Sequence, residues 1–192
     1  MTYLNFHTHH PEQEGEKAIL QGRDSWGIHP WHATEEHLEA MPPHPISAIG
    51  ECGLDRACNT PYPLQLRVFE KQIALSEAMQ KPLIIHCVKA FDDLTRLHRK
   101  HRPTQAWTIH GFRGKPQLMH SLLKEGFYLS FGFLHNPQSL VLCPIHRLFL
   151  ETDNTPSSIA SLYEEAAQLR NTTPEVLSLQ LFENLEKIHL HL

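Results

Sequence analysis

Short apolar segments recur along the whole chain, and longer segments with a helical period separate most of the later ones. The short segments are five or six residues long and rich in β-branched and aromatic residues. Continuous apolar runs of this length are typical of strands buried on both faces of a parallel sheet. We predict eight strands, at residues 2–7, 17–21, 25–29, 46–51, 82–87, 106–110, 127–132 and 147–152.

Apolar residues spaced by three and four positions predict helices between the later strands. Leu66, Phe69 and Ile73 follow this spacing within residues 64–79. Further helices are predicted over residues 91–101, 115–125 and 158–170, and a last one begins at Thr173-Pro174-Glu175. In that tripeptide the threonine suits the N-cap, the proline the first helical position and the glutamate the first turn.

This order of elements predicts an α/β fold, a distorted TIM-type (β/α)8 barrel formed by residues 1–192 as a single domain. The chain is short for such a barrel, which typically takes about 250 residues. Only residues 11–26 lie between His10 and Gly27 to form a loop, the second strand and the next connection. A parallel crossover takes about a dozen residues. We therefore expect the first two helices to be absent or shortened, which leaves one flank of the barrel bare.

Composition narrows the class of protein. The net charge of −4 argues against non-specific nucleic-acid binding, although bound divalent ions would reverse the local field. The chain has no run of 18 apolar residues, and its start lacks the pattern of a secretory signal, so we expect no membrane association. The four cysteines form no CxxC pair, which predicts free thiols and a cytoplasmic location: Cys52, Cys58, Cys87 and Cys143.

Histidine is unusually frequent, with 16 residues in 192. Six metal-competent side chains lie at or just after the carboxyl ends of five predicted strands: His7, His9, Glu51, His86, His110 and Asp153. In a parallel barrel these ends open on one face, where active sites lie. A lone histidine in such a position is most often an ordinary hydrogen-bonded residue, so the prediction of a metal site depends on the whole set.

Two histidine pairs share the same spacing, and the predicted element that carries each pair distinguishes them. Residues i and i+2 of a strand share a side, so His7 and His9 can chelate one ion while His10 points away. His189 and His191 have the same spacing at the end of a predicted helix, where the two side chains diverge by roughly 200°. We therefore interpret the second pair as part of the tail.

Imidazole and carboxylate ligands suit several divalent metals and do not distinguish among Zn, Mn, Mg, Co and Ni. Six ligands exceed the needs of one catalytic ion. With one bridging carboxylate they suit two divalent metal ions about 3.5–4 Å apart.

Seven segments of the chain resemble the ordered motifs of the TatD-related metal-dependent hydrolases, a family of amidohydrolase-like barrels. They are "NFHTHH", "WGIHPWH", "AIGECGLD", "KPLIIHCVKA", "IHGFRG" with "EGFYLSFG", and "LFLETDN". The resemblance implies a distorted barrel that hydrolyses phosphodiester bonds, with DNA as the usual substrate. It also implies that His7, His9 and Asp153 bind one metal, that His86 and His110 bind the second, and that Glu51 bridges the two.

The chain departs from the family pattern at three places. Asn5 stands where the family usually has an aspartate, and Val88, followed by Lys89, where it usually has an arginine. Trp31 displaces the second histidine after "GIHP" to His32. The missing arginine is expected to contact phosphate, and Arg113 could replace it from the next loop. His29, Lys89 and Arg113 are therefore predicted substrate contacts.

The resulting hypothesis is a hydrolase in which metal-activated water attacks phosphorus, Asp153 accepts the proton of that water and Glu51 remains ionised between the ions. Single-stranded DNA is one expected substrate. Two alternatives stay open: a metallohydrolase of a small phosphoester, amide or lactone, and an inactive metal-binding or interaction protein. The bare flank could expose apolar surface, which makes a homodimer a further hypothesis.

Overall fold

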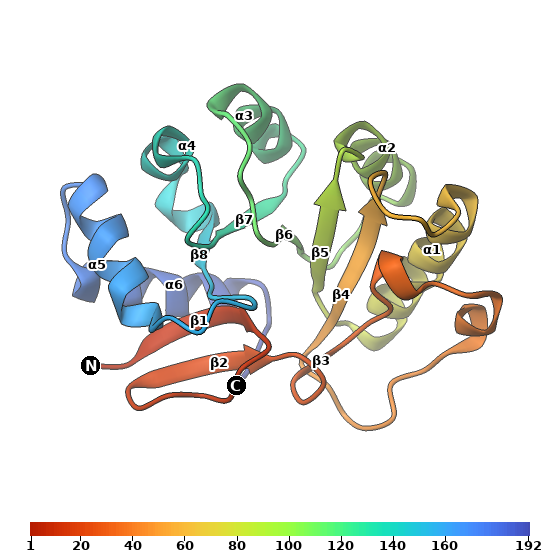
Figure 1. Cartoon of the computed structure of the whole chain (residues 1–192), viewed down its shortest axis with the longest axis horizontal. Helices are drawn as coiled ribbons and strands as arrows, with labels where there is room; N and C mark the ends of the chain where they lie inside the picture. Colours follow the sequence, from red (N-terminus) through yellow and green to blue (C-terminus); the bar gives the residue numbers. More distant parts are fainter.

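The computed structural model describes all 192 residues and arranges eight parallel strands around a ring in their order along the chain (Figure 1). The β1 and β2 strands form one sheet, and β3 to β8 form another. The strands are β1 Tyr3–Thr8, β2 Glu16–Leu20, β3 Ser25–Trp26, β4 Ala48–Asp55, β5 Leu83–Val88, β6 Trp107–Ile109, β7 Tyr128–Phe131 and β8 Leu148–Leu150. The predicted distorted TIM-type barrel is confirmed, and each predicted strand is present, although β3 is shorter than expected.

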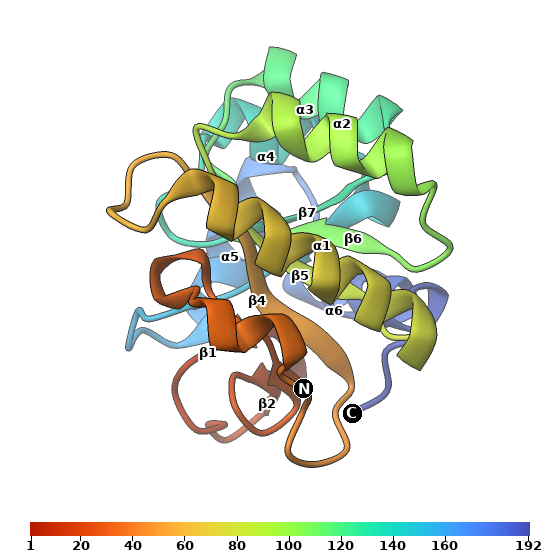
Figure 2. The ribbon, with the colours of Figure 1, turned by 90° about the vertical axis from the view of Figure 1, so that its right-hand side faces the viewer.

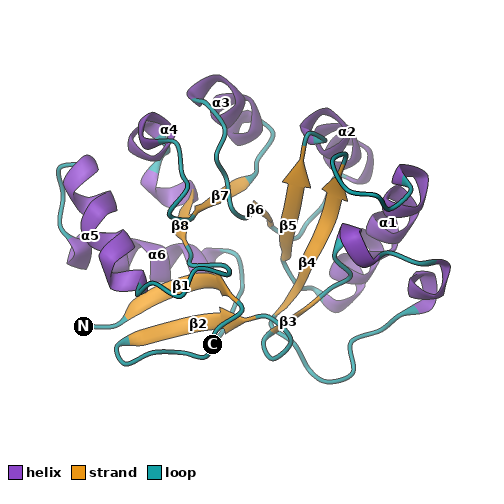
Figure 3. Ribbon diagram, in the orientation of Figure 1, coloured by secondary structure: helices purple, strands orange, loops and turns teal.

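The α-helices lie outside the strands (Figure 3). Figure 2 shows α1, α2 and α3 following one another over the outer side of the larger sheet. The helices are α1 Tyr62–Met79, α2 Phe91–His101, α3 Pro116–Lys124, α4 Pro137–Leu142, α5 Ile159–Leu169 and α6 Pro174–Lys187, with 3-10 helices η1 Pro30–His32, η2 Glu35–Glu39 and η3 Ile145–Arg147. Five of the α-helices match predicted ones. The α4 helix was missed, although Asn136-Pro137 is a good N-cap and first position.

No helix is both long enough and apolar enough to cross a membrane.

The first two α-helices of a regular barrel are absent, as the chain length predicts. Residues 9–15 connect β1 to β2 without a helix, and residues 21–24 form the turn before β3. Two isolated bridges join the two sheets, one between Thr8 and Asp153 and one between Gln21 and Ser25. The ring is therefore held together at these places by main-chain contacts.

The flank without helices leaves Leu20 of β2 partly exposed, whereas the other apolar side chains of this strand are covered. Ala18 and Ile19 are fully buried. Ile188 and Leu190, which follow α6, belong to the same apolar core as Ile19. The homodimer stays a prediction.

Asn5 connects three segments inside the barrel. Its side-chain amide donates to Glu16 Oε1 on β2 at 2.6 Å and to Thr152 Oγ1 after β8 at 2.8 Å. Its carbonyl oxygen accepts from the Thr152 main-chain nitrogen at 3.0 Å. Both Asn5 and Glu16 are buried, so an aspartate at position 5 would place two carboxylates against each other.

We predict that Asn5→Asp lowers the free energy of unfolding by about 1–3 kcal/mol, because it removes two buried donors and faces Glu16 with a like charge. In the double variant Asn5→Asp/Glu16→Gln the donor and acceptor exchange places, and most of the loss should be recovered. Urea unfolding of the four proteins in this cycle measures the effect. Simple additivity of the two substitutions would contradict the proposed pairing.

Candidate metal centre

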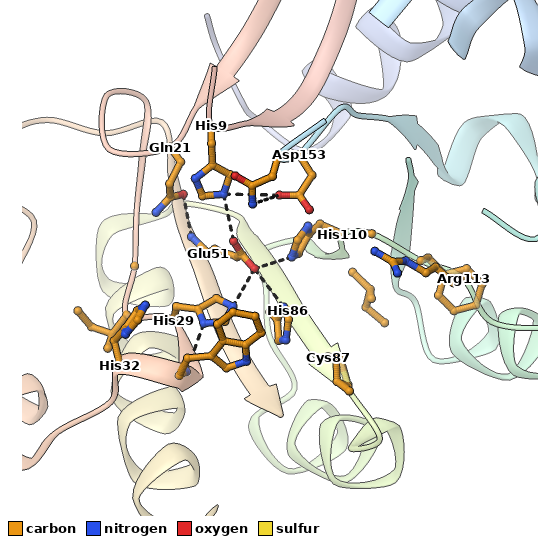
Figure 4. Close-up of a pocket in the computed structure, with 18 of the residues that line it drawn as sticks. His9, Gln21, His29, His32, Glu51, His86, Cys87, His110, Arg113 and Asp153 are labelled. Carbon is orange, nitrogen blue, oxygen red and sulfur yellow. Dashed lines mark hydrogen bonds and ion pairs between the residues drawn. The ribbon is translucent and has the colours of Figure 1, made fainter. Parts of the chain in front are cut away.

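The carboxylate of Glu51 lies at the carboxyl-end face of the barrel, where it meets five imidazole rings. Figure 4 shows those of His9, His29, His86 and His110. Glu51 itself is only 7% exposed. Its Oε2 lies 3.4 Å from His7 Nε2 and 3.5 Å from His9 Nε2, and its Oε1 lies 2.7 Å from His110 Nε2, 3.1 Å from His29 Nε2 and 3.1 Å from His86 Nδ1. The two oxygens of one side chain therefore face two groups of histidines.

The local backbone of β4 places this carboxylate. The pairing of β4 with β5 shifts register between Ile49 and Cys52, and such irregularities re-aim a side chain. The Glu51 nitrogen donates to Gln21 Oε1 at 3.0 Å. At Gly53, with φ of +135°, a Cβ would lie 2.1 Å from the His86 carbonyl oxygen. Only glycine allows β4 and β5 to approach this closely beside Glu51.

The first group consists of His7, His9, Glu51 and Asp153, whose ligand atoms all lie within 4.8 Å of one another. Asp153 Oδ1 is 3.8 Å from His7 Nε2 and 3.5 Å from His9 Nε2. Neither ring nitrogen of the fully buried His7 has a hydrogen-bond partner.

These separations fit a shared ion better than direct hydrogen bonds. Two ligands about 2.0–2.1 Å from a tetrahedral ion lie roughly 3.3 Å apart, whereas a good hydrogen bond to nitrogen is about 2.9 Å long. Main-chain bonds join the two sides of the group, from Asp153 N to His7 O at 3.0 Å and from His9 N to Asp153 O at 3.1 Å. The residues present therefore fit a divalent ion.

The second group is centred on Glu51 Oε1. His29, Glu51 and His86 offer ligand atoms within 4.8 Å of one another, and His110 contacts the same carboxylate oxygen. His29, predicted to orient water or phosphate, thus lies among the possible ligands. The binding of a second ion by His86 and His110 stays a prediction. The structure places a third imidazole, that of His29, beside the same carboxylate oxygen.

Two carboxylates that the sequence analysis did not single out contact the outer nitrogens of these histidines. Glu151 Oε1 lies 3.1 Å from His110 Nδ1 and also accepts from the Gly111 nitrogen at 2.6 Å. Asp55 Oδ2 lies 3.1 Å from His86 Nε2. Carboxylates in this position fix the orientation and tautomer of a ligating histidine. Both residues lie within segments already singled out, "AIGECGLD" and "LFLETDN".

The charges in the centre depend on one another. Burial disfavours ionisation of Glu51, but the surrounding imidazoles, His110 foremost, hold the pKa of its carboxyl far below the usual range. Burial likewise opposes the charge on Glu151, and His110 again lowers the pKa of that carboxyl. Burial also opposes the charge on His110, yet the two carboxylates raise its pKa well above the usual value. The carboxylates and imidazoles therefore form one coupled set of charges in which both carboxylates stay ionised.

The predicted substrate contacts border the same open cavity of about 870 Å³, which is lined in part by His29, Lys89, Arg113 and Val88. Lys89 and Arg113 are exposed, and neither forms an ion pair with a carboxylate. His10 lies outside both groups and contacts the Asn154 carbonyl at 3.1 Å, as its position in the strand predicts. His189 and His191 are exposed near the C-terminus, away from either group.

The model of one family, described as TatD related DNase, matches residues 12–189. The chain belongs to this family of metal-dependent hydrolases. The matched range begins after His7 and His9. Only the closeness of their ring nitrogens to Glu51 and Asp153 assigns these two residues to the candidate centre.

Relatives with related names support this membership. A Bacillus subtilis (strain 168) protein, "Uncharacterized metal-dependent hydrolase YabD", is 31% identical over 84% of this chain and 75% of that protein. The human "3'-5' RNA nuclease TATDN2" is 34% identical over 67% of this chain, but the match covers 19% of the human protein. An Erwinia billingiae protein, "3'-5' ssDNA/RNA exonuclease TatD", is 28% identical over 84% of this chain and 75% of that protein.

A solved structure supports the TatD fold independently. YJJV, a TATD homolog from Escherichia coli k12, superposes with a TM-score of 0.73 at 20% identity over 92% of this chain and 77% of that one. At this identity the likeness concerns the fold alone.

We predict that Glu151→Ala weakens binding of a divalent ion by about 10- to 100-fold, because His110 loses the carboxylate that orients its ring. Glu151→Gln is the matched control, since its amide oxygen can still accept from His110 and Gly111. Competition with a chromogenic chelator measures the affinity. Equal affinities for the alanine variant and the parent protein would show that Glu151 does not orient a ligand.

Proposed function

We propose that this single domain, residues 1–192, is a nuclease that uses two divalent metal ions to hydrolyse phosphodiester bonds in single-stranded DNA or RNA. The observation that carries the proposal is Glu51, whose two oxygens face separate groups of potential ligands on the floor of an open cavity. A carboxylate that can bridge two ions suits the two-metal hydrolysis of phosphodiesters. The names of the human and Erwinia relatives, both nucleases, support a nucleic-acid substrate.

In this proposal His7, His9 and Asp153 hold one ion, His86 and His110 hold the second, and Glu51 bridges them. His29 either completes the second set or orients the water. When bound, the ions supply a water of lowered pKa and positive charge beside the phosphoryl oxygens. The ligand types leave open which of Zn, Mn, Mg, Co and Ni is used.

The side chains of this chain would then divide the remaining work. Asp153 is partly exposed, with 31% of its side chain accessible, and it faces the cavity where it can accept the proton of the attacking water. Glu51 would keep its negative charge between the two cations, because a nearby positive charge favours the ionised form of a carboxyl group. Arg113 and Lys89 line the same cavity and bind the phosphate that the absent arginine at Val88 would have contacted.

Two further properties belong to the proposal. The four cysteines are free thiols, which supports a reducing location such as the cytoplasm. A homodimer remains to be tested by light scattering.

We predict that the purified protein shortens labelled single-stranded DNA and RNA when a divalent ion is present and stops when the ion is chelated. Asp153→Asn should lower the rate by about 100- to 10,000-fold, the usual contribution of a general base. Glu51→Gln should lower both activity and metal content. His189→Ala, which changes the exposed histidine pair of the tail, is the control and should match the parent.

The substrates of this assay separate the alternatives. Hydrolysis of a small chromogenic phosphodiester without cleavage of any oligonucleotide would replace the nuclease proposal by a small-phosphoester hydrolase. Absence of metal-dependent hydrolysis with either substrate would exclude both phosphoester functions and would leave an amide or lactone hydrolase or the inactive metal-binding protein.

We also predict that Arg113→Ala raises KM for single-stranded DNA by roughly 10- to 150-fold with a smaller change in kcat, as expected for one charge-assisted hydrogen bond to phosphate. Arg113→Lys should recover part of the affinity, because it keeps the charge and loses the paired donors. Lys115→Ala removes the same charge from an exposed residue of the same loop that does not line the cavity. An equal rise of KM in Lys115→Ala would mean that Arg113 acts only through its positive charge and makes no specific contact with phosphate.

A further inference from the structure

Trp31 is exposed at the edge of the cavity that contains the metal centre. It is the middle residue of η1, lines the cavity and is 56% exposed. No other aromatic residue in the chain is among the exposed large hydrophobic side chains. An aromatic ring that stays accessible beside a cavity is available to a ligand.

Contacts at the edge of the indole fix its orientation. The Nε1 group donates to Asp55 Oδ2 at 2.6 Å, and Asp55 is buried. The ring also makes an edge contact with His29, with centroids 4.8 Å apart and an interplanar angle of 85°. Two bonds hold its backbone, because Trp31 N donates to His29 Nδ1 and Thr60 Oγ1 donates to Trp31 O. The exposed tryptophan is therefore held in place before any ligand arrives.

Its position relative to the metal centre suits a nucleotide. The indole centroid is 6.0 Å from that of His86, a proposed ligand of the second ion. Figure 4 shows His29 and His32 on one side of Glu51 and Arg113 on the other. A nucleotide offers a flat base and a charged phosphate, and the cavity offers an aromatic surface on one side, a cation on the other and the metal ligands between them.

We propose that Trp31 is a stacking surface that binds an unpaired nucleobase beside the scissile phosphate, an inference that rests on the proposed nuclease function. Stacking on an aromatic ring tolerates any base sequence, because every base has a flat face. A base inside a duplex is paired and already stacked on both sides. Trp31 therefore makes the site selective for single-stranded nucleic acid and for frayed ends over intact duplex.

The test measures binding by the metal-free protein, so that it does not depend on hydrolysis. Fluorescence anisotropy gives the affinity for two labelled oligonucleotides, one intact and one whose 3′-terminal residues are abasic. The parent protein should prefer the intact strand, and Trp31→Ala should weaken binding of that strand by roughly 5- to 150-fold, the effect of losing one or more stacked bases. Binding of the abasic strand should hardly change.

Trp31→Phe separates stacking from the hydrogen bond to Asp55, because phenylalanine keeps an aromatic ring and lacks the donor. It should retain most of the preference for the intact strand. If Trp31→Phe is instead as weak as Trp31→Ala and both bind metal more weakly than the parent, Trp31 acts through Asp55 and His86, and stacking is wrong. Thermal unfolding of each variant shows whether the fold is kept.

The parent protein alone can also overturn the inference, without any substitution. Equal affinity for the intact and abasic strands would mean that no base stacks in this cavity. This outcome is distinct from a failure of the proposed function, which would appear as a lack of metal-dependent cleavage of either strand. Preference for the intact strand together with such a lack would leave Trp31 as a binding surface of an inactive protein.

Discussion

The structure depends on one buried negative charge, the carboxylate of Glu51. A carboxylate taken out of water costs several kcal/mol unless cations or donors surround it. Here the nitrogens of His7, His9, His29, His86 and His110 do so, and the neighbouring carboxylates of Asp153, Asp55 and Glu151 face those rings in turn. Five of the 16 histidines thus acquire a physical reason, because alternating imidazoles and carboxylates neutralise one another at the mouth of the barrel.

The same residues also help to close the barrel between its first and last strands. The seam between β1 and β8 is held by main-chain bonds between His7, His9 and Asp153, the same residues whose side chains form the first ligand group. Deeper in the barrel Asn5 connects β1 to Glu16 on β2 and to Thr152 after β8. An ion bound to the first group would span the seam and add to its closure. The departure at Asn5 therefore connects β1 to both of its neighbours, because its side-chain amide both donates and accepts hydrogen bonds.

Much of the architecture follows from periodicity and length. Short apolar runs specified the strands, and the few residues between His10 and Gly27 left no space for two helices. The alternation of side chains along a strand also placed His7 and His9 together. The same rule applied to Glu151 and Asp153 would have found the carboxylate behind His110. By contrast, no sequence rule could show that His29 joins His86 on Glu51, because their contact depends on how three strands curve around a bulge in β4.

The residues that form the site occupy two kinds of position, which differ in how freely they can be substituted. The six predicted metal ligands lie at strand ends or directly after them, where a shift of one residue would turn the side chain away from the centre. Val88 and Lys89, Trp31 and Arg113 lie at the border of the cavity, where side chains from neighbouring loops can supply the same charge or surface to a ligand. Asp55 connects the two kinds, since its Oδ2 contacts both Trp31 and His86. Substrate recognition can thus change through the residues at the border of the cavity. Asp55 meanwhile keeps Trp31 in a fixed position relative to the metal centre.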